Sequence, residues 1–141
     1  MKALLLLLLG ASAAAAGRLE RYTPAAFSSQ QQKDAYILLQ FNSDSCTVCP
    51  RQEISLQRLA SESSQPAVRY FKATFEVEDE LKKLYGVSAM STLLVFRGRY
   101  LIGRSAGLYT EDEIRAFLHK SMLEDRGKPK GRPKRKYGPK R

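Results

Sequence analysis

The sequence is poor in the side chains that bind metal ions. Its 141 residues include two cysteines, one histidine and no tryptophan. A structural zinc ion takes four Cys or His ligands, and His119 is far in sequence from Cys46 and Cys49. We therefore expect no metal site, and we expect no other cofactor.

The sequence also lacks an apolar run long enough to be an obvious membrane span. In "MKALLLLLLGASAAAAG", one lysine precedes a leucine run, and Ala14 and Ala16 form a small-residue cleavage signal. The uncharged stretch from residue 3 to residue 16 has 14 residues, whereas a transmembrane helix needs about 20. We expect residues 1–16 to be a signal peptide and the protein to be exported, to the periplasm or the extracellular space. A retained anchor is the alternative.

Positive charge is concentrated at the C-terminus. The formal net charge is +10, but residues 17–125 hold 14 Lys and Arg against 14 Asp and Glu, and residues 126–141 hold nine basic residues and no acidic one. A segment of this composition cannot bury enough apolar surface to fold, so we expect a basic disordered tail. Its partner would be an anionic surface, or it has no specific partner. We do not expect nucleic acid binding, because export separates the tail from the DNA and RNA of the cell.

Between these ends, the apolar pattern predicts alternating helices and strands. Thr23 followed by Pro24 is typical of a helix start. Further helices are expected over residues 52–63, 77–85 and 110–123, and strands over 35–41, 67–76 and the two arms of a hairpin within 91–107 that is joined at Arg97 and Gly98. Strands joined through helices are parallel, and the hairpin adds antiparallel pairing. We therefore expect an α/β fold with a mixed central β-sheet and helices on both faces.

The helices carry specific local signals. Gly86 is expected to close the helix over residues 77–85. Thr110 with Glu113 three positions later predicts a capping box. In the helix over residues 52–63, the spacing places four apolar side chains toward the core: Ile54, Leu56, Leu59 and Ala60.

Cys46 and Cys49 form a Cys-x-x-Cys motif just after the expected strand 35–41. Open α/β sheets have their functional sites at the carboxyl ends of strands. In an oxidising compartment such a pair can cycle between dithiol and disulfide, or it can remain a permanent structural disulfide. So short a loop removes little unfolded-state entropy, which favours the redox interpretation.

The chain from about residue 20 to residue 124 resembles a thioredoxin. After the strand and the Cys-x-x-Cys motif, "YGVSAMSTLLVF" is similar to that family's pattern of Tyr-Gly, an aliphatic residue, three further positions, a residue that is normally proline, and then Thr and a strand. The resemblance implies a thioredoxin-like three-layer fold over residues 17–125 and thiol–disulfide oxidoreductase activity on protein thiols and disulfides. We expect a separate redox partner, because the chain has no second cysteine pair, and we expect the protein to be a monomer.

The resemblance also implies roles for individual residues. Cys46 would be the nucleophile and Cys49 the resolving cysteine, and the two would form the disulfide of the oxidised state. A helix N-terminus favours the thiolate that attacks a disulfide. The substrate groove would consist of the residues beside and between the cysteines and of two later loops: Ser45, Thr47, Val48, Met90, Ser91 and Gly107.

Several of these residues depart from the family's usual ones. Ser45 replaces a common Trp, and Thr47 and Val48 replace Gly and Pro, so the family's usual reducing potential cannot be assumed. Ser91 replaces a cis-proline, which leaves the geometry of the peptide bond before it open. Loss of that proline can also open the cysteine pair to a metal or iron–sulfur cluster held between two chains, which we keep as an alternative. Pro50 suggests that the regular helix starts there and not at Cys46.

Gln40 and Lys72 would lie behind the cysteine pair. By the resemblance, Gln40 replaces a buried Asp that helps to move a proton for the second cysteine, and Lys72 matches the lysine partner of that Asp. A glutamine cannot act as a general base near neutral pH. Proton transfer to Cys49 would then use water, Lys72 or Glu76, or would be slower.

Two other functions stay open on the sequence alone. One is a non-catalytic binding module of thioredoxin fold, in which the loop at Met90 and Ser91 and the residue Gly107 form a docking groove and the disulfide is structural. The other is an envelope-associated protein whose main task is adhesion to anionic surfaces through residues 126–141.

Overall fold

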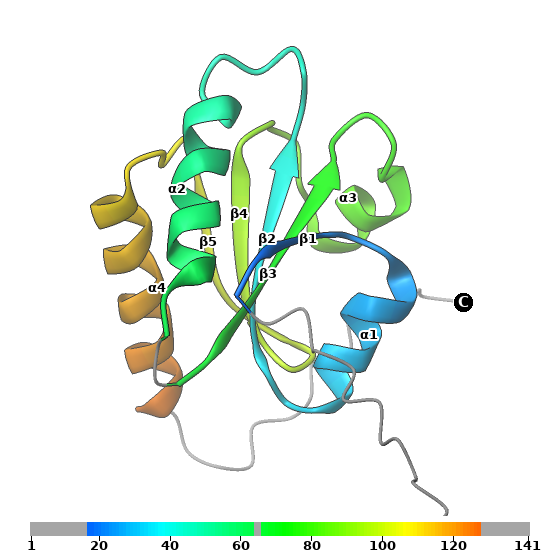
Figure 1. Ribbon diagram of the computed structural model, residues 1–141. Helices are drawn as coiled ribbons and strands as arrows, with labels where there is room; N and C mark the ends of the chain where they lie inside the picture. Colours follow the sequence, from blue (N-terminus) through cyan, green and yellow to red (C-terminus); the bar gives the residue numbers. More distant parts are fainter. Residues whose placement is uncertain (1–16, 64–65, 128–141) are drawn as a thin grey trace, which may run out of the picture.

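The computed structural model describes residues 17–63 and 66–127. The predicted signal peptide, residues 1–16, lies outside the described residues, as do residues 128–141 of the predicted tail. The described chain forms a β-sheet with helices on each side (Figure 1).

The sheet has five strands. They are β1 (Leu19–Arg21), β2 (Tyr36–Asn42), β3 (Val68–Thr74), β4 (Thr92–Arg97) and β5 (Tyr100–Ala106), in the spatial order β1-β3-β2-β4-β5. β1 and β2 both pair with β3 in parallel, whereas β4 is antiparallel to β2 and to β5. The predicted mixed sheet and its hairpin are confirmed. The sequence pattern did not predict β1, because three residues are too few to show a periodicity.

Within the described residues, four helices cover the two faces of the sheet. α1 (Pro24–Gln32) and α3 (Asp79–Tyr85) lie on one face, and α2 (Cys49–Ser61) and α4 (Glu111–Arg126) lie on the other (Figure 1). All four occur where the sequence predicts a helix. The three-layer α/β fold is therefore confirmed.

The predicted capping signals set the ends of the helices. Thr23 caps α1, because its hydroxyl oxygen accepts the N–H of Ala26 at 3.2 Å. Thr110 and Glu113 form the predicted capping box of α4. Gly86 closes α3 with a φ of 63°, a left-handed conformation that glycine adopts without steric cost.

Two details of the helices differ from the sequence pattern. Leu56, Leu59 and Ala60 are buried as predicted, but Ile54 is 51% exposed, so its assignment to the core is wrong. Ile54 lies two residues before Leu56, which is about 200° around a helix and therefore on the opposite side. In addition, α4 runs through Arg126, which places the first residue of the predicted tail in a helix.

Strand β2 is covered on both faces, and its alternation places Gln40 beneath α2. Ile37, Leu39 and Phe41 belong to the cluster under α1 and α3, whereas Leu38 packs in the cluster under α2 and α4. Because successive side chains of a strand point to opposite faces, Gln40 shares the face of Leu38. A buried polar side chain therefore lies on the sheet directly below the helix that begins at the cysteine pair.

Within the described ranges, no helix combines the length and the apolar character that crossing a membrane would require.

Candidate active site

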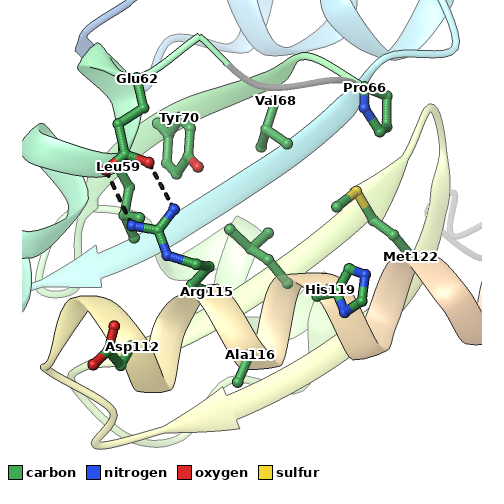
Figure 2. Close-up of a pocket in the computed structure, with 11 residues that line it drawn as sticks. Leu59, Glu62, Pro66, Val68, Tyr70, Asp112, Arg115, Ala116, His119 and Met122 are labelled. Carbon is green, nitrogen blue, oxygen red and sulfur yellow. Dashed lines mark hydrogen bonds and ion pairs between the residues drawn. The ribbon is translucent and has the colours of Figure 1, made fainter.

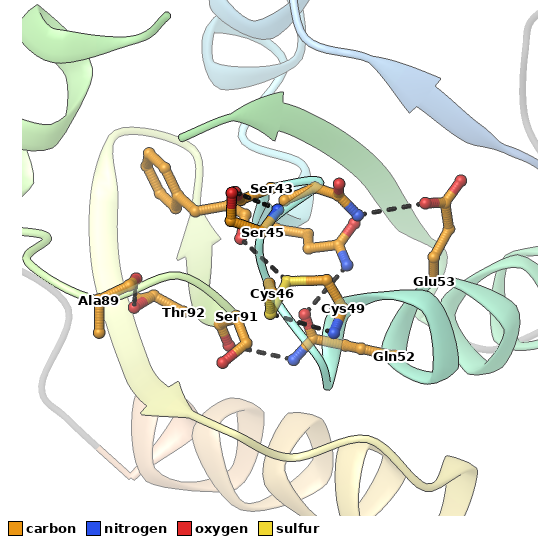
Figure 3. The surroundings of a disulfide bond; sticks show 12 residues. Ser43, Ser45, Cys46, Cys49, Gln52, Glu53, Ala89, Ser91 and Thr92 are labelled. Carbon is orange, nitrogen blue, oxygen red and sulfur yellow. Dashed lines mark hydrogen bonds between the residues drawn. A yellow bond between two sulfur atoms is a disulfide. The ribbon is translucent and has the colours of Figure 1, made fainter. Parts of the chain in front are cut away.

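Cys46 and Cys49 form a disulfide just beyond the carboxyl end of β2 (Figure 3). Their Cα atoms are 5.4 Å apart. Cys46 is half-buried in the loop before α2, whereas Cys49 is fully buried in the first turn of that helix. Cys49 is therefore closed to solvent, whereas part of Cys46 is open to it.

The N-terminus of α2 favours a negative charge on Cys46. The helix begins at Cys49, with Pro50 in its first turn, and no side chain caps it. The N–H of Cys49 donates to the sulfur of Cys46 at 3.1 Å. This hydrogen bond and the partial positive charge of the helix end both stabilise a thiolate. The regular helix begins one residue before Pro50 and leaves Cys46 outside, so the thiolate would depend chiefly on this one amide.

The loop between β2 and the cysteines is tied to the end of β3 through Ser43. The buried Ser43 hydroxyl accepts the N–H of Ser45 at 3.1 Å and donates to the carboxylate of Glu76. This hydrogen bond is the main cause that lowers the pKa of Glu76 from its ordinary value. The side chains of Ser45 and Thr47 are exposed, and the half-buried Val48 occupies the N-cap position of α2.

The loop before β4 lies beside the disulfide. The N–H of Ser91 donates to the carbonyl oxygen of Phe41 at 2.9 Å, and the same oxygen lies 4.0 Å from the sulfur of Cys49. The N–H of Gly107 donates to the carbonyl oxygen of Ser91 at 3.3 Å. The fold thus brings Ser91, its half-buried neighbour Met90 and Gly107 to the cysteine pair. Their contact with substrate stays a prediction.

Ser91 has an unusual backbone conformation. Its φ is 61°, in the left-handed region, and it is one of two such residues other than glycine in the described chain. A non-glycine residue in this region costs about 1 to 3 kcal/mol and persists where its surroundings hold it. Proline has a φ fixed near −65°. The loop at Ser91 is therefore not a proline loop with one side chain exchanged, because its backbone follows a different path.

Gln40 and Lys72 lie side by side on β2 and β3, as register partners in the parallel ladder. The resemblance implies that Lys72 pairs with the residue at position 40, but Lys72 has a different partner. Lys72 forms its ion pair with Glu53 of α2, at 2.8 Å, and the amide of Asn42 also donates to Glu53, at 3.1 Å. The carboxylate that meets Lys72 therefore comes from the helix and not from the strand. Whether Gln40 and Lys72 influence the cysteines stays a prediction.

Gln40 itself pairs with a second buried amide. Its Nε2 donates to Oε1 of Gln52 at 3.0 Å. Its Oε1 is buried and has no hydrogen-bond partner within the described chain. A buried polar atom of this kind is an acceptor that a buried water molecule can satisfy.

Sequence reasoning did not identify Gln52 and Glu53 as site residues. A signal was present, because Gln52, Ser55 and Leu59 lie at the i, i+3 and i+7 spacing of one helix side, and that side is buried. A polar residue on the inward side of a helix must have a buried partner. The partners of Gln52 were not predictable, because Gln40 lies on β2 and Ser91 and Leu108 lie in loops that are distant in sequence.

A separate pocket lies between α2, β3 and α4 (Figure 2). It has a volume of about 360 Å³ and a mainly apolar lining that includes Val68, Tyr70 and Met122. His119 also lines the pocket. Burial of Tyr70 raises the pKa of its hydroxyl to about 12. Val68 begins β3, whereas the disulfide follows the end of the parallel strand β2, so the two features lie at opposite ends of the sheet.

Comparisons with known proteins agree with this geometry. Residues 18–120 match the thioredoxin family, so the chain belongs to it. The structure is similar to that of Trxlp from Edwardsiella tarda, with 33% sequence identity and a TM-score of 0.66 over 71% of this chain and 97% of that one. It is also similar to a thioredoxin from Malassezia sympodialis, with 15% identity and a TM-score of 0.66 over 74% and 91% of the two chains. None of the curated proteins compared with the chain matches it significantly.

The family and the site together define the class of protein. A thioredoxin domain that carries a Cys-x-x-Cys pair bonded as a disulfide is a thiol–disulfide oxidoreductase. Proteins of this fold act on protein thiols and disulfides. In the described part of the chain, no group of three or more His, Cys, Asp or Glu side chains is arranged to hold a metal ion.

Proposed function

We propose that the protein is an exported oxidoreductase that exchanges disulfides with protein substrates, with Cys46 as the nucleophile and Cys49 as the resolving cysteine. The observation that carries these roles is the difference in exposure between the two cysteine residues: Cys46 is half-buried, and Cys49 is fully buried. The hydrogen bond from the N–H of Cys49 to the sulfur of Cys46 supports the same assignment.

The exchange proceeds in two steps. The Cys46 thiolate attacks one sulfur of a substrate disulfide, which forms a bond between Cys46 and the substrate, and the second substrate sulfur leaves as a thiolate that takes up a proton. The Cys49 thiolate then attacks the sulfur of Cys46, so the first substrate sulfur also leaves and is protonated. Two electrons pass from the protein to the substrate, and the Cys46–Cys49 disulfide forms. The reverse steps oxidise a substrate dithiol.

A separate dithiol or disulfide protein, or a small thiol, must complete each cycle. The chain holds two cysteines in all, so it cannot pass the electrons on to a second pair of its own. We propose that the protein meets this partner as a monomer. The direction of flow depends on the reduction potential of the Cys46–Cys49 pair relative to that of the partner.

Insulin reduction tests the proposed activity. The full chain should reduce insulin in the presence of dithiothreitol, and Cys46→Ser should lower the rate to that of dithiothreitol alone. A rate for Cys46→Ser equal to that of the unaltered protein would contradict the proposal. It would favour a binding module in which the disulfide is structural.

The proposed export depends on residues 1–16, whose composition is that of a signal peptide. A fusion of residues 1–20 to alkaline phosphatase, an enzyme that is active only after export, should be active in intact cells. The same fusion without residues 1–16 should be inactive. Equal activity of the two fusions would contradict export through this segment.

We further propose that residues 126–141 bind anionic surfaces, since they carry nine basic residues and no acidic one. Each basic residue near an anionic membrane contributes about 1 kcal/mol, and the attraction is screened by salt. The full chain should bind phosphatidylserine vesicles at low salt and be released at high salt. A chain that ends at residue 127 should not bind, and equal binding by both would contradict the proposal.

A further inference from the structure

Gln52 is a buried amide at the centre of the candidate site. It is fully buried in the first turn of α2, three residues after Cys49. Its Nε2 donates to the carbonyl oxygen of Ser91 at 3.0 Å and to that of Leu108 at 2.6 Å. Its Oε1 accepts from Nε2 of Gln40 at 3.0 Å. Burial of an amide is unfavourable unless its polar atoms are paired, and Gln52 has partners for both of its N–H groups and for its oxygen.

These hydrogen bonds connect the cysteine helix to two loops that are distant in sequence. Ser91 lies in the loop before β4, and Leu108 lies in the segment between β5 and α4. Figure 3 shows Gln52 reaching from α2 toward Ser91, with the disulfide beside both. The side chain of Gln52 therefore holds both loops at a fixed position relative to the helix that carries Cys49.

The backbone of Ser91 depends on this support. Its left-handed φ of 61° is unfavourable for serine by itself. Its N–H is held by the carbonyl oxygen of Phe41, and its carbonyl oxygen accepts from both Gln52 and Gly107. A proline in this place would have no N–H to donate and would not adopt a positive φ. In this chain, hydrogen bonds from Gln52 and from the backbone hold Ser91 at a positive φ, which a proline ring could not adopt.

We propose that Gln52, supported by Gln40, is a positioning residue that holds the loop at Met90 and Ser91 against the disulfide and thereby sets the affinity for protein substrates. This inference rests on the proposed exchange at Cys46. The loop at Ser91 and Gly107 lies beside the cysteine pair, so a polypeptide joined to the half-buried Cys46 is large enough to lie against that loop as well. A small disulfide reaches the sulfur with few contacts to that loop, so the two kinds of substrate should respond differently when the loop is released.

The test compares Gln52→Met with a matched control, Gln30→Met. Methionine has nearly the length of glutamine but cannot make the three hydrogen bonds, and Gln30 is a buried glutamine of α1 on the opposite face of the sheet. For Gln52→Met we expect KM for insulin to rise about fivefold or more, since removal of a buried hydrogen bond typically has an effect of that order. The kcat/KM for 5,5′-dithiobis(2-nitrobenzoate) should fall by less than about twofold. The control should keep both constants near those of the unaltered protein.

A readout of redox equilibrium separates positioning from damage to the cysteine pair. The equilibrium of Gln52→Met with glutathione should stay within about twofold of that of the unaltered protein, because Cys46 and Cys49 keep their own contacts. An unchanged KM for insulin, or a parallel loss of activity toward both substrates, would overturn the inference. If the unaltered protein reduces neither substrate, the proposed function itself fails, which is a different result.

A second variant keeps the test decisive if Gln52→Met does not fold. Gln40→Met removes the donor to Oε1 of Gln52 but leaves the two hydrogen bonds to Ser91 and Leu108 possible. It should raise KM for insulin by about twofold to threefold, with the same small effect on the small disulfide. An unchanged KM for a folded Gln40→Met would contradict the support that we assign to Gln40.

Discussion

The two faces of the sheet are built from different side chains. Under α1 and α3, aromatic rings pack edge to face: Phe27 lies 5.7 Å from Phe71 and 5.4 Å from Phe96, and Tyr85 lies 5.0 Å from Phe96, between ring centroids. Under α2 and α4, an apolar cluster is joined by buried polar side chains: Gln40, Gln52, Ser55 and Ser121.

This difference suggests that one face mainly stabilises the fold and that the other mainly positions the loops around the disulfide. Aromatic pairs are worth about 0.5 to 1.5 kcal/mol beyond the area that they bury, whereas the disulfide lies at the N-terminus of α2, which covers the other face. Buried amides contribute little net stability, yet each of their hydrogen bonds has a defined direction. On the face covered by α2 and α4, the buried amide of Gln52 holds the loops around the disulfide. The aromatic rings on the other face contribute mainly to the stability of the fold.

The largest expected effect comes from the aromatic face. Phe96→Ala should lower the free energy of unfolding by about 3 to 5 kcal/mol, because it leaves a cavity among packed rings. Insulin reduction per folded molecule should stay within about twofold of the unaltered rate. Urea unfolding and activity measured on the same samples check both statements.

Ile54→Ala on α2 is the control for this comparison. Ile54 is 51% exposed, so its removal should change the free energy of unfolding by less than about 0.5 kcal/mol. A loss of specific activity in folded Phe96→Ala would show that the aromatic face also positions the site, and the contrast between the faces would not hold.

The next effect concerns the loop at Ser91. Ser91→Pro should destabilise the protein by about 2 kcal/mol or more, because proline excludes the φ of 61° and removes the hydrogen bond to Phe41. Ser91→Ala keeps the backbone N–H and should cost less than about 1 kcal/mol. Thermal and urea unfolding of Ser91→Pro and Ser91→Ala measure both losses of stability. A Ser91→Pro protein as stable as the unaltered one would mean that the loop readily adopts the usual proline conformation.

The buried amide pair should show a smaller, coupled effect. Gln40→Leu leaves Oε1 of Gln52 unpaired, and Gln52→Leu removes the partner of Nε2 of Gln40 and a donor to the carbonyl oxygens of Ser91 and Leu108. An unpaired buried polar group costs about 1 to 3 kcal/mol. The double variant should be more stable than the sum of the two losses predicts, by about 1 kcal/mol. A double-mutant cycle in urea measures this coupling. Losses that add within about 0.3 kcal/mol would show that the hydrogen bond between the two amides contributes nothing.

The smallest expected effect is a pH dependence at Glu76. Its pKa in the folded protein is lowered, chiefly by the hydrogen bond from Ser43. The stabilisation is therefore complete above the unfolded pKa of about 4.3 and is lost as the pH falls through the folded value. The difference in stability between the unaltered protein and Glu76→Gln should be largest near neutral pH and shrink as the pH falls below about 4.3.

Ser43→Ala removes the donor and serves as the control for this prediction. In a Ser43→Ala background, Glu76→Gln should have a smaller effect that depends less on pH. Unfolding curves measured from neutral to acidic pH test it. A difference that grows on acidification would have the wrong sign for a carboxylate stabilised in its ionised form.

The sequence predicted the fold closely where a signal is local. Thr23, Gly86 and the box of Thr110 and Glu113 marked helix ends, and the apolar run over 35–41 marked the central strand. The prediction missed β1, which has three residues and forms only by pairing with β3. It placed Ile54 in the core because it assigned Ile54 to the same helix side as Leu56, although the two residues are about 200° apart around the helix.

The candidate site was predictable only in part, for a similar reason. The position of Cys46 and Cys49 follows from local order along the chain. The partners of the buried groups depend on contacts between distant segments: Lys72 meets Glu53, and Gln52 reaches Ser91 and Leu108. Neither pairing leaves a periodic signal in the sequence. The resemblance to a family implied a different pairing, with the strand residue at position 40 as the partner of Lys72.

The central claim is that the half-buried Cys46 attacks substrates and the buried Cys49 releases them. The most direct test is to trap the mixed disulfide with oxidised insulin and to identify it by mass spectrometry under non-reducing conditions. Cys49→Ser should accumulate a covalent complex through Cys46, because the resolving thiol is absent, and Cys46→Ser should accumulate none. A complex formed by Cys46→Ser through Cys49, with none formed by Cys49→Ser, would contradict the account.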